Sequence, residues 1–304
     1  MDLMALAYSM PGAIAQGLIW GIMAIGVYIT YKVLDVADLT VDGTMCTGGA
    51  VCAVMIANGY NIWVCLLVAL LAGMLAGLLT GVFHTFMGIP AILAGILTQY
   101  ALYSINLKIM GKANHPISSN KYDLLVSLRN VWDFTLQNPI LVAAIFVFAL
   151  IAILYWFFGT ERGCSIRATG GNPNMSRAQG INTSNNKIIG LMISNGIVAL
   201  SSALLAQFQG FADVNMGRGA IVIGLAAVVI GNVIFSRIFH NFALKLLAVA
   251  IGSVIYQVIY AFVVWLGVDK DLLKLLAAII VAVFLAVPYW KKKYFAKPMI
   301  KEVE

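Results

Sequence analysis

Charged residues are scarce in this sequence. Asp, Glu, Lys and Arg make up 10% of the 304 residues, whereas hydrophobic residues make up 62%. Soluble domains carry about 25% charged residues, so the composition excludes an ordinary water-soluble fold. Uncharged stretches cover residues 43–107, 134–160 and 246–268, among others. A bilayer core about 30 Å thick needs roughly 20 apolar residues per helix, which predicts about nine transmembrane helices. We therefore expect an all-α polytopic membrane protein, with residues 1–304 forming a single transmembrane domain.

Several kinds of site are also missing. The four cysteines lack the paired spacing of a zinc or redox site, and the three histidines lie far apart in the sequence. No glycine-rich phosphate loop ending in Lys and Ser or Thr occurs, so any ATP must bind to another chain. No carboxylate falls in the centre of an expected span, which argues against a proton- or sodium-coupled carrier. We expect no catalytic site, no metal site and no cofactor in this chain.

Basic residues are in excess, giving a net charge of +7, but they flank the hydrophobic stretches. This pattern is typical of membrane topology rather than of nucleic-acid binding. It places the C-terminus in the cytoplasm and the N-terminus outside, in a multi-pass membrane protein. The lysine-rich tail, residues 289–304, is interpreted as a cytoplasmic topology anchor, with a contact to anionic membrane lipid as the alternative.

The expected spans are interrupted where Gly, Pro and Asn gather. We place the spans near residues 11–31, 43–58, 61–83, 90–108, 138–159, 188–208, 217–235, 241–264 and 272–288. The second is short and glycine-rich and follows two aspartates, so a broken or partly inserted helix is expected there. Our hypothesis is that Asp38 and Asp42 hold a break at Gly43 by accepting backbone N–H bonds.

Two loops are long enough to have a function. In the outer loop, residues 109–137, five apolar residues at helical spacing predict an interfacial amphipathic helix: Leu124, Leu125, Leu128, Val131 and Trp132. A plain connector and a gate or docking site are both open readings of it. In the inner loop, residues 160–187, Asn172 suits an N-cap, Pro173 the first helical position and Gly180 the position after the end. A short cytoplasmic helix over 173–179 is expected.

The fourth span carries uncharged polar residues on one face. Gln99, Tyr103 and Asn106 follow a three-to-four-residue spacing, and Tyr100 lies beside them. A polar face of this kind is expected to line a wet path for a polar solute. Hydrogen bonding between helices is the alternative reading.

The inner loop resembles a known family. The run from Arg167 to Asn182, Arg-Ala-Thr-Gly-Gly-Asn-Pro-Asn-Met-Ser-Arg-Ala-Gln-Gly-Ile-Asn, is followed by a span and an Ala/Val-rich segment ending Val-Ile-Gly-Asn at Asn232. This pattern resembles permeases of the branched-chain amino acid and ribose ABC importers. In that family the segment is the cytoplasmic coupling helix that docks in a groove of the ATPase. By resemblance the coupling residues are Gly171, Asn172, Pro173, Met175, Arg177, Ala178, Gly180, Ile181 and Asn182.

Three upstream motifs narrow the resemblance. Residues 21–28 (Gly-Ile-Met-Ala-Ile-Gly-Val-Tyr), 38–43 (Asp-Leu-Thr-Val-Asp-Gly) and 102–106 (Leu-Tyr-Ser-Ile-Asn) look like permeases paired with tryptophan- or tyrosine-type binding proteins. The resemblance covers residues 10–290.

The resemblance implies a type II ABC importer permease of the bacterial plasma membrane, acting as a homodimer or close heterodimer. It further implies two cytoplasmic ATPase subunits, which bind ATP and Mg²⁺, and an extracytoplasmic substrate-binding protein or lipoprotein. The expected solute is a small polar molecule, with an aromatic, tryptophan-like amino acid favoured. A branched-chain amino acid, a sugar, a nucleoside, or an autonomous carrier or channel remain the alternatives.

Overall fold

The computed structural model describes residues 3–118, 121–132, 137–236 and 238–267, together with residues 272, 275, 278–279, 281–283 and 286. The expected span at 272–288 lies mostly outside these residues, and so does all of the tail at 289–304.

Helices account for eight of the nine expected spans. They are α1 (Leu3–Tyr28), α2 (Thr40–Ala57), α3 (Ile62–Thr85), α4 (Ala91–Met110), α5 (Pro139–Gly159), α8 (Thr183–Gln209), α9 (Ala220–Phe235) and α10 (Phe242–Trp265). Helix α1 continues into a π-helical turn, η1 (Ile29–Val33). In the described part, six helices are long and apolar enough to cross a membrane, and α4 and α9 are not among them. The all-α membrane fold is confirmed, whereas a count of nine spans is not.

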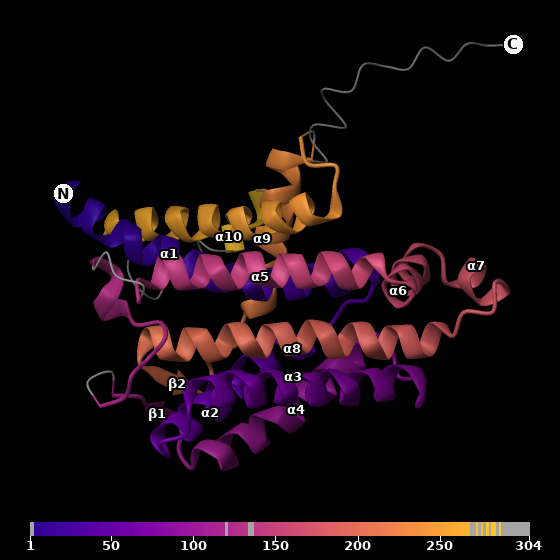
Figure 1. Cartoon of the computed structure of the whole chain (residues 1–304), viewed down its shortest axis with the longest axis horizontal. Helices are drawn as coiled ribbons and strands as arrows, with labels where there is room; N and C mark the ends of the chain where they lie inside the picture. Colours follow the sequence, from indigo (N-terminus) through magenta and orange to yellow (C-terminus); the bar gives the residue numbers. More distant parts are fainter. Residues whose placement is uncertain are drawn as a thin grey trace, which may run out of the picture.

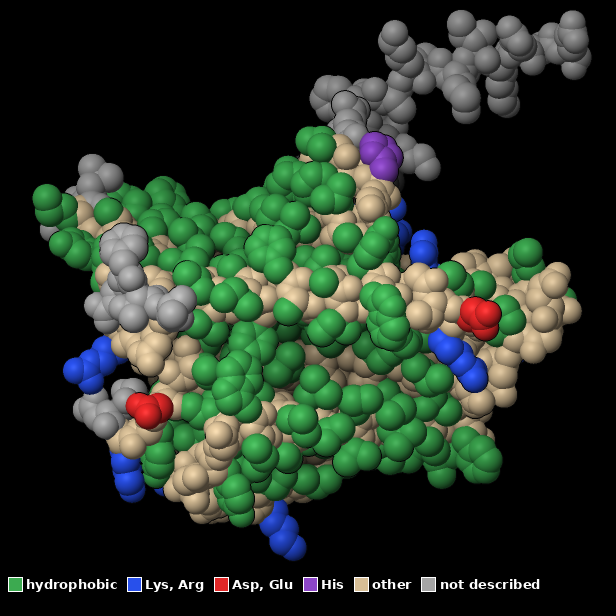
Figure 2. All heavy atoms as spheres, viewed as in Figure 1, with side chains coloured by type: hydrophobic (Ala, Val, Ile, Leu, Met, Phe, Trp, Pro, Cys, Tyr) green, Lys and Arg blue, Asp and Glu red, His purple; other side chains and the backbone are tan. Residues whose placement is uncertain are grey.

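The long helices run side by side, and the shorter elements gather at the two ends of the molecule (Figure 1). At one end lie α6 (Glu161–Gly171) and α7 (Pro173–Ala178), and we call it the α7 end. At the opposite end, the strand end, β1 (Asn114–Pro116) pairs antiparallel with β2 (Phe211–Asp213). Figure 2 shows hydrophobic side chains over the middle of one face and most charged side chains towards the ends. This distribution fits a bilayer around the middle.

Helix α8 is the centre of the packing and is buried along most of its length. Glycines on its neighbours let their backbones approach it closely. A Cβ atom added at Gly48 of α2 would meet the carbonyl oxygen of Ala199, and one at Gly77 of α3 would meet that of Leu191. Small residues permit such close contact between membrane helices. The packing brings α2 and α3 against α8 and leaves α4 outside them, against α2.

Two expectations about local structure are wrong. The chain leaves helical geometry between η1 and α2, at residues 34–39, and α2 then passes through Gly43 without a break. Gly43 instead admits a neighbour, because an added Cβ atom would lie 3.0 Å from Cα of Gln99 on α4.

The outer loop holds no amphipathic α-helix in its described residues, only a 3₁₀ turn, η2 (Leu128–Trp132). Leu124 and Val131 are buried in the core, so their side chains do not form one face at a membrane surface. The loop is also tied down by the pairing of β1 with β2, which the sequence patterns did not indicate.

Candidate functional site

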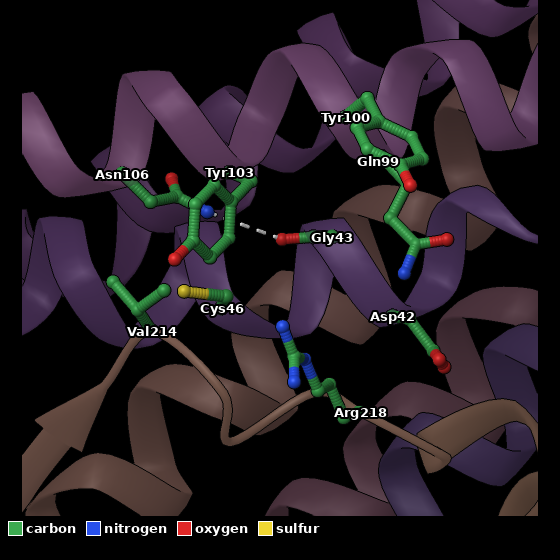
Figure 3. Close-up of a pocket in the computed structure, with 9 residues that line it drawn as sticks. All are labelled: Asp42, Gly43, Cys46, Gln99, Tyr100, Tyr103, Asn106, Val214 and Arg218. Carbon is green, nitrogen blue, oxygen red and sulfur yellow. Dashed lines mark hydrogen bonds between the residues drawn. The ribbon is translucent and has the colours of Figure 1, made fainter. Parts of the chain in front are cut away.

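A cavity of about 470 Å³ lies between α2, α4 and the segment that leads from β2 to α9. Its lining residues are Asp42, Gly43, Cys46, Gln99, Tyr100, Tyr103, Asn106, Val214 and Arg218 (Figure 3). All four residues of the predicted polar path are therefore brought together at one cavity. Its volume falls in the range of pockets that bind small molecules. That these residues contact a solute stays a prediction.

The polar face of α4 is graded from exposed to buried. Tyr100 is 76% exposed and Tyr103 43%, whereas Asn106 is fully buried. The Asn106 side chain donates from Nδ2 to the carbonyl oxygen of Gly43, with 3.4 Å between the two atoms. One amide group thus ties α4 to α2 at the wall of the cavity. Its Oδ1 atom has no hydrogen-bond partner among the described residues.

Asp42 links the starts of two helices. Its carboxylate accepts the backbone N–H groups of Gly219 and Ile221, each at 3.0 Å, and so caps α9 from the first turn of α2. The preceding turn fits closely, because an added Cβ atom at Gly217 would meet the carbonyl oxygen of Asp42. A carboxylate at a helix N-terminus is favoured by hydrogen bonding and by the helix dipole.

The depth of this contact follows from the length of α2. Asp42 lies about 24 Å along the helix axis from Asn58, the residue that ends α2, at 1.5 Å per residue. Asn58 lies at the strand end, where the carbonyl of Ala57 beside it accepts from Tyr122 of the outer loop. A hydrocarbon core is about 30 Å thick, so the cavity wall formed by Asp42 falls within its span and nearer the side of the α7 end.

Asp38 has a related role at the start of α2. Its Oδ1 accepts the backbone N–H of Thr40 at 2.9 Å, and its Oδ2 accepts from Nδ2 of Asn195 on α8 at 2.7 Å. Thr44 donates to Oδ1 of the same asparagine at 2.7 Å. Both aspartates thus accept backbone N–H groups, as the hypothesis required. They hold the starts of α2 and α9, however, and not a break at Gly43.

Sequence reasoning missed Arg218. It is exposed at the cavity, and in Figure 3 its side chain extends towards Gly43 and Cys46. Within the described residues its guanidinium group has no ion pair or hydrogen bond. The one available signal was a lone basic residue inside a Gly- and Asn-containing turn, immediately before an apolar helix. From the sequence alone, such a residue is as typical of a basic residue that sets membrane topology as of a functional residue.

The predicted coupling segment lies at the α7 end. Asn172 caps α7 by accepting the N–H of Met175 at Oδ1, at 3.0 Å. Gly180 has the positive φ of 78° expected after the helix, and its N–H donates to the carbonyl of Arg177 at 2.9 Å. The short helix is therefore confirmed, ending at Ala178. Its Met175 side chain is 63% exposed and Ala178 is also exposed.

The remaining coupling residues fix α7 to its neighbours. Gly171 is the last residue of α6, an unpredicted helix, and Ile181 is half-buried beyond α7. Asn182 caps α8 by accepting the N–H of Asn185 at 3.1 Å. Arg177 donates from Nε to Oγ1 of Thr183 at 2.9 Å, which holds the guanidinium towards α8. Together these contacts present α7 as a braced, exposed element.

The described residues contain no group of three or more His, Cys, Asp or Glu side chains that could hold a metal ion. The absence of a cofactor remains a prediction.

Comparison with known proteins identifies the family. Residues 9–287 match the family described as "Branched-chain amino acid transport system / permease component". The chain belongs to this permease family. The resemblance inferred from the motifs is thereby confirmed, and the protein is a multi-pass permease of the ABC transporter type.

Its relatives carry different solute names. The permease is 42% identical to a tyrosine transport system permease protein of Clostridioides difficile (strain R20291), over 89% of this chain and 88% of the relative. It is 34% identical to an uncharacterized protein of Rickettsia prowazekii (strain Madrid E), over 90% and 95%. A fructose import permease protein of Bifidobacterium longum (strain NCC 2705) is 26% identical, over 81% and 68%. No solved structure matches the permease.

Proposed function

We propose that this chain is the transmembrane subunit of an ATP-driven importer, and that it moves an amino acid of the aromatic, tyrosine-like class through the cavity between α2 and α4. The observation that carries the proposal is the cavity itself, where Gln99, Tyr100, Tyr103 and Asn106 meet. Two tyrosine rings offer stacking surfaces and two amides offer hydrogen bonds, a combination suited to an amphipathic solute. The similarity to a tyrosine permease supports the same class.

The energy source is proposed to act through α7. A six-residue helix is not stable alone in water, yet α7 is capped at Asn172, closed at Gly180 and braced by Arg177. Its exposed Met175 and Ala178 form an apolar surface of the size that a groove of a partner ATPase would cover. With the α7 end in the cytoplasm, closure and separation of two ATPases would open the path alternately to either side.

Partners complete the proposal. A second copy of the permease would close the path, because Tyr100 places an aromatic ring and a hydroxyl group on an exposed face of α4. Permease components of this kind work with an ATPase and with a solute-binding protein. An extracytoplasmic binding protein would deliver the solute at the strand end. The C-terminal tail would lie on the ATPase side.

Uptake by the assembled transporter tests the solute class. The permease is reconstituted into proteoliposomes with its ATPase and binding protein, and ATP-dependent uptake of labelled L-tyrosine, L-tryptophan, L-leucine and D-fructose is measured. We expect uptake of the aromatic amino acids to exceed that of leucine and fructose. Uptake of fructose without uptake of any amino acid would contradict the proposal, as would equal transport in the absence of ATPase.

Ala178→Asp tests the coupling role of α7, with Ala113→Asp as a matched control. Both alanines are exposed, but Ala113 lies next to β1 at the strand end. Burying a charge under the ATPase should weaken its binding, whereas a charge at Ala113 stays in water. We expect loss of ATPase co-purification and of substrate-stimulated hydrolysis in Ala178→Asp alone. Normal binding and stimulation in both variants would show that α7 is not the coupling element.

A further inference from the structure

Among the residues that the structure describes, Arg218 is the one basic residue that lines either of two neighbouring cavities. The first is the cavity between α2 and α4, and the second, of about 490 Å³, also has Arg218 in its lining. The second cavity is lined by aromatic and amide side chains, including Trp20, Tyr256 and Gln257. Arginine at membrane depth is costly, and it marks a solute or ion path by default. Because Arg218 lines both cavities, it is the candidate for contact with a charged solute that passes through them.

The guanidinium group of Arg218 has no ion pair and no hydrogen bond in the part of the chain that the structure describes. The nearby carboxylate of Asp42 is committed to the N–H groups of Gly219 and Ile221. An arginine with five donors and no acceptor opposite is suited to bind an anionic group in bidentate geometry. A carboxylate is the anion whose planar shape matches that geometry best.

Asn106, in contrast to Arg218, needs a hydrogen-bond donor from the solute. Its Nδ2 atom donates to Gly43, and Oδ1 is a fully buried acceptor without a partner in the described part of the chain. A buried unsatisfied acceptor destabilises the protein unless a ligand or water completes it. An ammonium group supplies the donors that this oxygen lacks. One cavity thus offers a partner for an anionic group of the solute, at Arg218, and a partner for a cationic group, at Asn106.

We propose that Arg218 and Asn106 recognise the zwitterionic head of an α-amino acid. Arg218 binds the carboxylate, Oδ1 of Asn106 accepts from the ammonium group, and Tyr100 and Tyr103 contact the side chain. A neutral sugar would leave the guanidinium without a counter-charge, so these residues select amino acids over sugars. This inference rests on the proposed function and names the groups that determine its solute class.

Solute analogues separate the two charged groups. The probes are L-tyrosine, tyramine, which lacks the carboxylate, and 3-(4-hydroxyphenyl)propionate, which lacks the ammonium group. Binding is measured by competition with labelled L-tyrosine on the permease–ATPase complex in nanodiscs. The binding protein is left out, because it would impose its own selectivity.

Arg218→Gln is the central variant, and Lys112→Gln is its control. Lys112 is exposed at the strand end, next to β1, and lines neither cavity. Losing a charge-assisted pair should weaken L-tyrosine binding about 10- to 100-fold and leave tyramine binding within about threefold. The preference for tyrosine over tyramine then disappears in Arg218→Gln and is retained in Lys112→Gln. Arg218→Lys should retain part of it, since the charge remains without the bidentate geometry.

The outcomes distinguish the inference from the proposed function. If the wild-type complex binds L-tyrosine but Arg218→Gln keeps the same preference over tyramine, the carboxylate site is wrong and the importer proposal stands. If the wild-type complex binds D-fructose and no amino acid, the solute class itself is wrong. If Arg218→Gln fails to assemble, Arg218→Lys decides, because an unchanged preference in a folded Arg218→Lys variant overturns the bidentate pair. Asn106→Leu should lose the preference for L-tyrosine over 3-(4-hydroxyphenyl)propionate. An unchanged preference in this variant would overturn the ammonium contact at Asn106.

Discussion

Asp42 offers a quantitative test of how α9 is held. In Asp42→Ala the N–H groups of Gly219 and Ile221 lose the acceptors that lie 3.0 Å away. A hydrogen bond to a charged group contributes about 1.5–3 kcal/mol, and Asp42 is only half-buried, so the low end applies. Two such bonds give an expected destabilisation of about 2–4 kcal/mol, which lowers Tm by several degrees. Asp42→Asn keeps an acceptor and should cost about half as much.

The assay is thermal unfolding of the purified permease in detergent, followed by the change in tryptophan fluorescence. Asp213→Ala is the matched control, because Asp213 accepts one N–H, that of Asn215, in an exposed turn. Its loss should cost about 1 kcal/mol or less. Equal Tm values for Asp42→Ala and Asp213→Ala would refute the conclusion that Asp42 anchors the start of α9.

Three further predictions follow from the site and the packing. Gln99→Leu and Tyr103→Leu should each lower tyrosine uptake several-fold with assembly intact, and unchanged uptake kinetics in both would return these residues to helix packing. Asn172→Ala removes the cap of α7, at about 1 kcal/mol, and should weaken ATPase binding measured by titration; Asn172→Ser should restore it. Gly77→Ala forces α3 away from the Leu191 carbonyl and should destabilise by about 1–3 kcal/mol in the thermal assay, whereas Gly159→Ala, with open space around it, should have little effect.

Local patterns predicted which residues share a helix face and where a short helix begins and ends, because neighbouring residues determine both. The spacing of Gln99, Tyr103 and Asn106 is enough to place them on one side of a helix, and the structure brings them to one cavity. The ends of α7 were predicted for the same reason, because Asn172 and Gly180 act within one or two turns of their own backbone.

Contacts between distant segments were not predictable in this way. The turn at Gly217 packs on α2, which is far away in the sequence. This contact brings Arg218 to the cavity and places Asp42 at the start of α9. Gly43 suggested a break because glycine weakens an isolated helix, yet in the packed protein it gives room to Gln99 of α4. The prediction of an interfacial helix in the outer loop was wrong for a similar reason. Val131 gains more from burial in the core than from a continuous helix.

The shortness of α9 has a consequence for the order in which the protein assembles during membrane insertion. Its 16 residues extend about 24 Å, less than the hydrocarbon thickness of about 30 Å, so α9 cannot cross a bilayer alone. Its first N–H groups would face lipid unsatisfied until Asp42, from the N-terminal quarter of the chain, reaches them. The late part of the polypeptide therefore needs the early part as a template, and the two cannot mature as independent halves.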